Sequence, residues 1–176
     1  MYLWESISAT VWNQEEATSP GELVSAVVCG PFDYLFPKKS FLVVLKDSYT
    51  KFRYSFVIKE KSDVKYVLKI MLVHAKNLGH SVKEFLIDNG GEFDNKEVCA
   101  ILSQVGITQR LTAPYTPVQN GTSERERRTI IEMERTLKYS NPDGIYPAAV
   151  WAELVTTAIY VLNRTGKSSV EGASSY

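Results

Sequence analysis

Residues 41–58 read FLVVLKDSYTKFRYSFVI, and this stretch decides the fold of the chain. Its opening run FLVVL is continuously apolar, which is typical of a strand at the centre of a sheet. A polar turn follows, and residues 52–58 alternate well enough between apolar and polar side chains to form the next strand. Residues 23–29 supply another apolar run, which we expect Gly30 and Pro31 to end. The pattern therefore predicts a three-stranded meander.

Helices and short strands alternate after this meander. Ser62 is a good N-cap for a helix whose apolar residues recur on one face, and Gly79 marks the end of that helix. The later elements are expected at residues 85–87 (strand), 96–104 (helix closed by Gly106), 107–111 (strand), 123–138 (polar helix) and from near Pro147 to Gly166 (helix with an apolar stripe). This order predicts an α/β fold with a mixed five-stranded sheet flanked by helices.

Composition bounds the class of protein. A chain of 176 residues with 44% hydrophobic and 23% charged residues suits one globular domain with a sizeable core. The formal net charge is zero, but residues 1–33 hold five acids and neither Lys nor Arg. The remainder therefore carries 20 bases against 15 acids (20 − 5), a mildly basic body that is compatible with a polyanionic partner.

Cysteine and histidine are too scattered for a structural zinc site. Cys29 and Cys99 lie far apart, and His74 and His80 lie away from both, so we expect no zinc. A disulfide framework is equally disfavoured, which predicts an intracellular protein. The sequence contains no apolar run of about 18 residues and does not begin with a secretory signal pattern, so we expect no membrane association.

Asp88 is the first candidate for chemistry. It lies in the motif IDNGGEF, residues 87–93, at the end of a short strand. α/β sheets bind ligands at the carboxyl ends of their strands. The two glycines of the motif leave room for a phosphate to approach the backbone. The alternative is a plain turn, because Asp-Asn-Gly-Gly is also good turn chemistry.

Glu124 is the second candidate, 36 positions further on in the motif PYTPVQNGTSERERRT, residues 114–129. Two carboxylates placed in this way suit divalent cations that support phosphoryl transfer on nucleic acid. The alternative is a capping charge, because Glu124 is expected in the first turn of a helix, with Arg127 and Arg128 as ion-pair partners. The charges around it are mixed in sign, so charge alone favours this alternative.

The two motifs, in this order and at this spacing, resemble the catalytic core of integrases of retroviruses and, above all, of copia-type LTR retrotransposons. The family pattern reads roughly SDNGGEF, then SAPYTPQQNGVAER.NRT. The segments PGEL…CGP, FLVVLKDSYTKF and WAELVTTAIYVLNRTGKSSVEG resemble other parts of that core. The resemblance implies a ribonuclease-H-like fold, with residues 1–17 unassigned, residues 18–140 as the core and residues 141–176 as a truncated helical extension of a polyprotein fragment.

The resemblance also implies a function. In the family, two aspartates and a glutamate hold two Mg²⁺ or Mn²⁺ ions for 3′ processing and strand transfer, and Asp88 and Glu124 match the second aspartate and the glutamate. DNA is the implied partner, with homo-oligomerisation and nuclear action. The implied nucleic-acid-binding residues are Tyr115, Asn120, Arg125 and Arg128.

One position departs from the family. The family reads PGELIHSDVCGP where this chain reads PGELVSAVVCGP, so the first catalytic aspartate falls on Val27. Valine cannot ligate a metal, which predicts that DNA integration is impaired. Asp47 is the better candidate to replace the lost ligand, because Asp33 lies beyond Gly30 and Pro31. The alternative function is a non-catalytic nucleic-acid-binding or interaction module, co-opted or decaying.

Overall fold

A mixed five-stranded sheet forms the centre of the protein. The computed structural model describes residues 17–32, 40–87, 93, 95–111, 117–140, 144, 146–147 and 150–166. The strand order is β3-β2-β1-β4-β5. β1 to β3 pair antiparallel as a meander, whereas β4 and β5 run parallel to β1. The strands are β1 (Leu23–Phe32), β2 (Ser40–Asp47), β3 (Arg53–Ile58), β4 (Glu84–Ile87) and β5 (Thr108–Leu111). The predicted mixed five-stranded sheet is confirmed.

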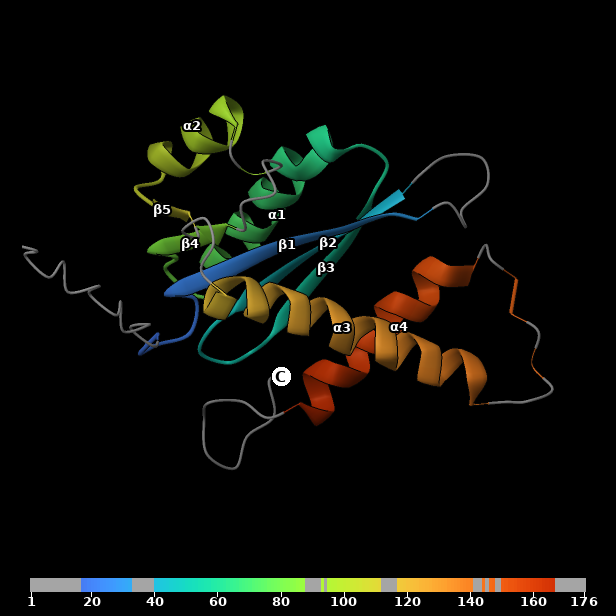
Figure 1. Cartoon of the computed structure of the whole chain (residues 1–176). Coiled ribbons are helices and arrows are strands. Elements are labelled where there is room, and N and C mark those ends of the chain that lie inside the picture. The colour runs from blue at the N-terminus through green and yellow to red at the C-terminus, as the bar shows by residue number, and fades with distance from the viewer. Residues whose placement is uncertain are drawn as a thin grey trace, which may run out of the picture.

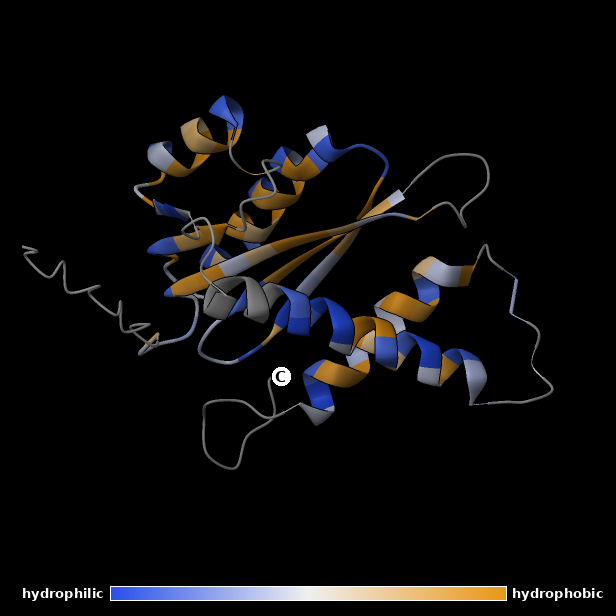
Figure 2. Cartoon of the chain, in the orientation of Figure 1, coloured by the Kyte–Doolittle hydropathy of each residue, from blue (hydrophilic) through white to orange (hydrophobic). Residues whose placement is uncertain are grey.

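Helices cover both faces of this sheet (Figure 1). α1 and α2 lie on one face, and α3 and α4 cross the other. The described helices are the 3₁₀ turn η1 (Lys61–Asp63), α1 (Val64–Asn77), α2 (Lys96–Gln104), α3 (Pro117–Tyr139) and α4 (Trp151–Thr165). Figure 2 shows the apolar strands lying between these layers, and the middle of α3 as largely hydrophilic.

The alternation of side chains along β1 separates two apolar cores. Val24 and Ala26 are buried in the core beneath α1 and α2, where Phe85, Leu68 and Met71 also pack. Val27 and Cys29 face the other way, toward the core beneath α3 and α4. This period-two geometry of a strand decides that Val27 lies on the α3 side of the sheet.

Local sequence explains where two helices end. Gly79 and Gly106 follow α1 and α2 with φ of +80° and +72°, the left-handed conformation that favours glycine. The N–H of His80 donates to the Ala75 carbonyl at 2.9 Å, and the N–H of Ile107 donates to the Leu102 carbonyl at 2.9 Å. These are the bonds of Schellman caps, so both predicted helix ends are confirmed.

The predicted N-cap of the first helix is wrong. Ser62 lies inside η1, which begins after Glu60. Its hydroxyl is 3.3 Å from the Glu60 carboxylate, and the Asp63 carboxylate accepts the Glu60 N–H at 3.2 Å. A 3₁₀ turn therefore leads into α1, because acidic side chains on either side of Ser62 take the capping role.

Three further boundaries differ from the prediction. β1 continues through Gly30 to Phe32, with a register shift after Cys29. Gly30 is required there by close approach rather than as a strand end, because a Cβ atom would lie 3.0 Å from the Ser40 carbonyl oxygen. α3 already begins at Pro117, a residue type well suited to a first helical turn. α4 begins only at Trp151, after the Pro147 carbonyl accepts the N–H of Val150.

Candidate functional site

The candidate site lies where β1 and β4 run parallel beneath α3. Their register pairs Ala26 with Ile87, the last residue of β4. Val27 follows Ala26 within β1, and Asp88 follows Ile87 in the sequence. Asp88 and Tyr115 lie outside the described residues, as does the side chain of Asn120. The predicted roles of these residues stay predictions.

Val27 sits in an apolar setting. It pairs across the sheet with Val44 of β2 and packs, partly buried, against the core beneath α3 and α4. That core consists of Cys29, Leu42, Val44, Ile130, Trp151, Val155, Ile159 and Leu162. A β-branched side chain suits such a central strand position, because it packs well on a pleated surface. The strand is therefore intact at the position where the resemblance to the family predicts an aspartate.

Glu124 occupies an exposed position on α3, seven residues after Pro117. The prediction that Glu124 opens the helix is therefore wrong, and so is the capping alternative that depended on it. The pKa of the Cys29 thiol is raised to about 11, mainly by burial; the charge of Arg127 opposes this shift, and the charges of Glu124 and Glu126 add to it. Cys29 and Val27 lie on the same face of β1. The charge of Glu124 therefore acts on the face of the sheet that bears Val27.

Glu126, which the sequence did not single out, is a buried carboxylate of α3. Its Oε2 lies 2.5 Å from Lys46 Nζ of β2, and its Oε1 accepts a hydrogen bond from Arg53 Nε of β3. Burial opposes ionisation, but the hydrogen bonds and charges of Arg53 and Lys46 outweigh it and lower the pKa of Glu126. The one indication in the sequence is that Glu126 lies four residues before Ile130, so that the two share a helix face. Ile130 is buried in the structure.

Asp47 does not replace the missing ligand. Its register partner Val24 faces the core beneath α1, on the side of the sheet away from Val27. Its Oδ1 accepts the Gly21 N–H at 2.9 Å, and its Oδ2 accepts the N–H and hydroxyl of Thr50 at 2.8 and 2.6 Å. Asp47 is thus a buried turn anchor whose two oxygens are both engaged.

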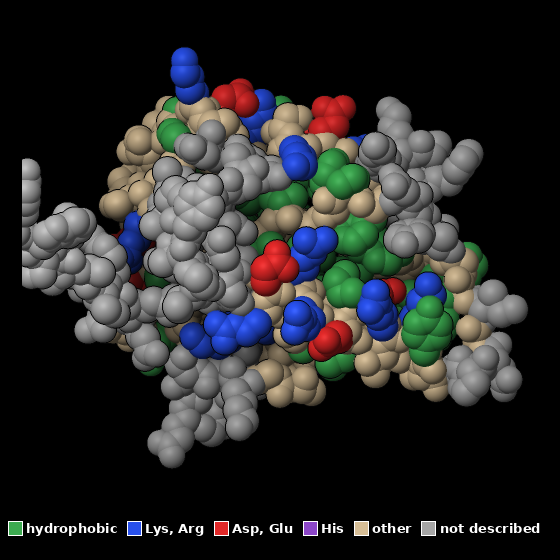
Figure 3. Space-filling model, in the orientation of Figure 1, with side chains coloured by type: hydrophobic (Ala, Val, Ile, Leu, Met, Phe, Trp, Pro, Cys, Tyr) green, Lys and Arg blue, Asp and Glu red, His purple; other side chains and the backbone are tan. Residues whose placement is uncertain are grey.

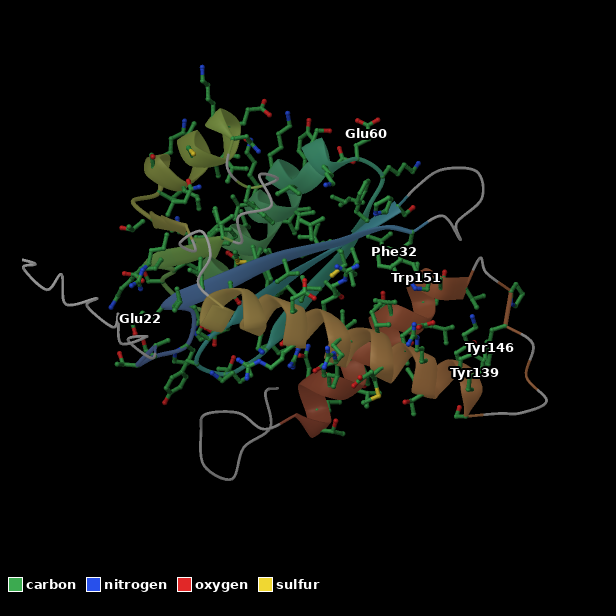
Figure 4. The ribbon with its side chains drawn as sticks, viewed as in Figure 1. Glu22, Phe32, Glu60, Tyr139, Tyr146 and Trp151 are labelled. Carbon is green, nitrogen blue, oxygen red and sulfur yellow. The ribbon has the colours of Figure 1, made fainter. Side chains whose placement is uncertain are left out.

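A groove extends from Glu124 along α3. This α3 groove encloses about 670 Å³ between the end of β1, α3 and the start of α4. Phe32 stacks on Trp151 with ring centroids 4.1 Å apart, and Tyr139 lies near Tyr146 (Figure 4). Figure 3 shows Lys and Arg side chains interspersed with acids along this part of the surface. The charged side chains that line the groove are Arg127, Arg128, Arg135, Lys138, Glu124 and Glu134.

The cationic lining of the groove is compatible with a polyanion. Guanidinium and ammonium groups contact phosphates, and aromatic faces stack on bases. Arg128 lines the groove, whereas Arg125 is exposed outside its lining, and the predicted DNA contacts of both residues stay predictions. Among the residues that the structure describes, no group of three His, Cys, Asp or Glu side chains could hold a metal. Val27, the paired Glu126 and the turn anchor Asp47 do not fit the donor set of two divalent cations.

These features define an α/β core with a mixed five-stranded sheet, and sequence comparison identifies its family. The family model described as "Integrase core domain" matches residues 17–117. The chain belongs to the integrase core domain family. Val27 lies inside the matched part and Glu124 lies beyond it.

Its relatives are copia-type retrotransposon polyproteins. The chain is 33% identical over 147 residues to the "Retrovirus-related Pol polyprotein from transposon TNT 1-94" of Nicotiana tabacum, which covers 82% of this chain and 11% of the relative. It is 33% identical over 125 residues to the corresponding polyprotein from transposon RE2 of Arabidopsis thaliana, covering 70% of this chain and 8% of the relative. The chain thus spans about a tenth of the length of these relatives.

Solved structures confirm the ribonuclease-H-like fold. A chain of the simian T-cell lymphotropic virus intasome in complex with PP2A regulatory subunit B56 gamma superposes with a TM-score of 0.68 at 16% identity, covering 89% of this chain and 53% of that one. The HTLV-2 integrase catalytic core domain in complex with magnesium gives 0.62 at 16% identity, covering 89% and 94%. Within the described part of the chain, no helix is long and apolar enough to cross a membrane.

Proposed function

We propose that this integrase core binds DNA through the α3 groove and, with its present sequence, does not carry out phosphoryl transfer. The observation that carries the proposal is Val27, a partly buried apolar residue on the face of β1 that turns toward α3. The printed sequence places Val27 directly after Ala26 and Asp88 directly after Ile87, and Ala26 pairs with Ile87 in the parallel register of β1 and β4. Without a carboxylate in place of Val27, Asp88 and Glu124 remain as the proposed metal and catalytic ligands, one short of the family set.

The reaction of the ancestral protein, on this proposal, is DNA integration by 3′ processing and strand transfer. Mg²⁺ or Mn²⁺ supplies that chemistry by stabilising the attacking and leaving oxygens. Two carboxylates hold cations less well than three, because affinity and geometry both depend on the number of ligands. We therefore expect divalent cations to bind weakly to this chain and to leave its DNA intact.

The choice of DNA as partner is supported by the groove. Arg127, Arg128, Arg135 and Lys138 give it four cations, against the two acids Glu124 and Glu134. Tyr115, Asn120 and Arg125 are proposed contacts on the family pattern. Each neutralised phosphate contributes a slope of about −0.9 to the dependence of log affinity on log salt. Affinity should therefore fall steeply as salt rises.

The test of lost activity compares the chain with Val27→Asp and Val27→Asn in nicking and strand-transfer assays with Mn²⁺ on labelled duplex ends. Asn matches Asp in size but lacks the charge, so it controls for packing. We expect cutting by Val27→Asp alone, together with a rise in its melting temperature on addition of Mn²⁺. Cutting by the unaltered chain would show that another group supplies the third ligand and would overturn the proposal.

The second candidate function is a non-catalytic nucleic-acid-binding or interaction module. It is favoured by the same Val27, because the fold at this position is well packed without a carboxylate. DNA binding measured by fluorescence anisotropy tests the groove directly. We expect the pair Arg127→Ala and Arg128→Ala to weaken binding and reduce its salt slope, whereas Lys59→Ala, on an exposed turn, serves as the control. Equal binding by both variants would remove DNA as the partner of the groove.

Two wider features follow from the family and are proposals for this chain. Integrases act as multimers, so we propose homo-oligomerisation, which sedimentation of the purified chain measures. Nuclear action is proposed because DNA is the substrate, and it is checked by imaging of a tagged chain. The simian intasome and the trimeric HTLV-2 core are assemblies of those proteins and do not measure the oligomeric state of this chain.

A further inference from the structure

The buried face of α3 carries two glutamates, and they differ in what they contact. Glu126, Ile130 and Glu134 recur every four residues and are 7%, 1% and 6% exposed, so they share one face of the helix. Glu126 pairs with Lys46 and Arg53. By contrast, Glu134 forms no hydrogen bond or ion pair with any residue that the structure describes. One carboxylate of this face is thus satisfied by the sheet, and the other is not.

The lack of a described partner for Glu134 indicates a ligand, because buried polar groups in proteins are nearly always hydrogen-bonded. A carboxylate that is removed from water without a partner costs free energy. The cation with the best spacing along the helix is Lys138, four residues after Glu134, a distance that favours an ion pair. The Lys138 ammonium instead lies over the Tyr139 ring, 5.6 Å from its centroid. The oxygens of Glu134 are therefore available to donors from outside the chain.

Glu134 lines the α3 groove together with cations and exposed rings. The groove encloses about 670 Å³, within the range of about 300–1,000 Å³ that is typical of small-ligand sites. Arg135 and Lys138 lie close to Glu134 along the helix and line the same groove. Tyr139 is 69% exposed and Tyr146 is 37% exposed, and both border this space (Figure 4). The groove thus combines a buried acceptor with cations that suit a phosphate and rings that suit the face of a base.

The base that best matches a lone carboxylate is guanine. The two oxygens of a carboxylate accept two parallel hydrogen bonds from adjacent donors of one planar group. The Watson–Crick edge of guanine presents such a pair, N1–H and the N2 amine, whereas adenine and cytosine present one amine beside an acceptor nitrogen. Thymine presents one N–H between two carbonyl oxygens, which a carboxylate repels. Because this edge is occupied by cytosine in a duplex, a guanine that reaches Glu134 is unpaired.

We propose that the α3 groove binds an unpaired guanine of single-stranded DNA, whose N1–H and N2 amine donate to the Glu134 carboxylate. The base stacks on an exposed tyrosine ring of the groove, and the neighbouring phosphate lies beside Arg135 and Lys138. This inference rests on the proposed binding of DNA in the groove and adds a base preference to it. Glu134 determines specificity and takes no part in phosphoryl transfer, because 134 − 124 = 10 helical positions, about 15 Å, separate it from Glu124.

Fluorescence anisotropy of the full chain with labelled single-stranded thymidine tracts tests the base preference. Each tract carries one central guanine, hypoxanthine, adenine or cytosine, and hypoxanthine differs from guanine only in lacking the N2 amine. We expect the guanine tract to bind about tenfold more tightly than the hypoxanthine tract, as for a bidentate contact to a base. Equal affinity for these two, or a preference for adenine or cytosine, overturns this inference. If no tract binds, binding of a duplex overturns this inference alone, and no binding of a duplex overturns the proposed function as well.

The variant Glu134→Gln isolates the contribution of the carboxylate. Glutamine keeps the size of the side chain but replaces one acceptor oxygen with a donor, so it cannot accept both guanine N–H groups. We expect Glu134→Gln to bind the guanine and hypoxanthine tracts equally, whereas Glu132→Gln, at an exposed position of the same helix, keeps the preference. Retention of the preference by Glu134→Gln would overturn the assignment. Its melting temperature should not fall, because the carboxylate has no partner to lose. A clear fall would reveal a structural partner of Glu134 and would also overturn it.

Discussion

Lys46 Nζ of β2 lies 2.5 Å from the Glu126 carboxylate of α3, and Arg53 of β3 holds the other oxygen of the same carboxylate. One buried glutamate thus joins the helix that carries Glu124 to two strands of the meander. Removing these charges from water costs free energy, which offsets their attraction. The pair therefore contributes mainly by fixing the geometry of the elements that it joins. Here it ties α3 to β2 and β3.

Glu126→Gln should destabilise the fold. The substitution keeps the size of the side chain but leaves the buried cations without a counter-charge, a loss of about 3–5 kcal/mol in the free energy of unfolding. Urea unfolding of the variant and of Glu132→Gln, an exposed glutamate of the same helix, measures the difference. A change in Glu126→Gln no larger than in the control would show that the buried pair contributes nothing.

The stability conferred by Glu126 should depend on pH. Its pKa in the folded protein lies below the ordinary value of 4.5, so the folded state holds the ionised form more strongly than the unfolded state does. The contribution is therefore complete above pH 4.5 and is lost as pH falls through the lowered pKa. The stability difference between the unaltered chain and Glu126→Gln should be constant near neutrality and shrink in acid. A difference that stays constant down to pH 3 contradicts this assignment.

The Cys29 thiol should be unreactive in the folded protein. Burial raises its pKa to about 11, so at pH 8 only about one molecule in a thousand carries the reactive thiolate. A Cys99→Ser variant leaves Cys29 as the one thiol, and a chromogenic disulfide reagent reports its reaction rate. We expect slow labelling that becomes fast in urea. Equally fast labelling with and without urea would show that the core beneath α3 is open.

Asn163 should be required for the edge of the sheet. This buried residue of α4 accepts the Arg53 N–H and donates its Nδ2–H to the Arg53 carbonyl, both at 2.9 Å. Asn163→Leu removes both bonds and leaves two buried backbone groups without partners, at a cost of about 1–3 kcal/mol each. The melting temperature should fall clearly below that of Asn77→Leu, an exposed control at the end of α1. Equal melting temperatures would contradict this role.

Much of the fold could be predicted from the sequence, because the relevant chemistry is local. Gly79 and Gly106 end their helices through a left-handed conformation that few other residues adopt easily. The apolar run of β2 predicts a central strand, and β2 is buried along most of its length. The family could also be predicted from the sequence, because its motifs are short and occur in a fixed order along the chain. The boundaries of α3 and α4 were not, since prolines are compatible both with loops and with first turns.

The sequence by itself determined the order of elements and the family, and it predicts the loss of a catalytic aspartate at Val27. Only the tertiary structure decided which carboxylates are already engaged in ion pairs or hydrogen bonds away from the candidate site. Glu124 and Glu126 stand two residues apart on one helix, yet one is exposed and the other is buried against Lys46 and Arg53. The difference depends on strands 73 and 80 residues away in the chain. Spacing along a helix determines which residues share a face, but packing determines what that face meets.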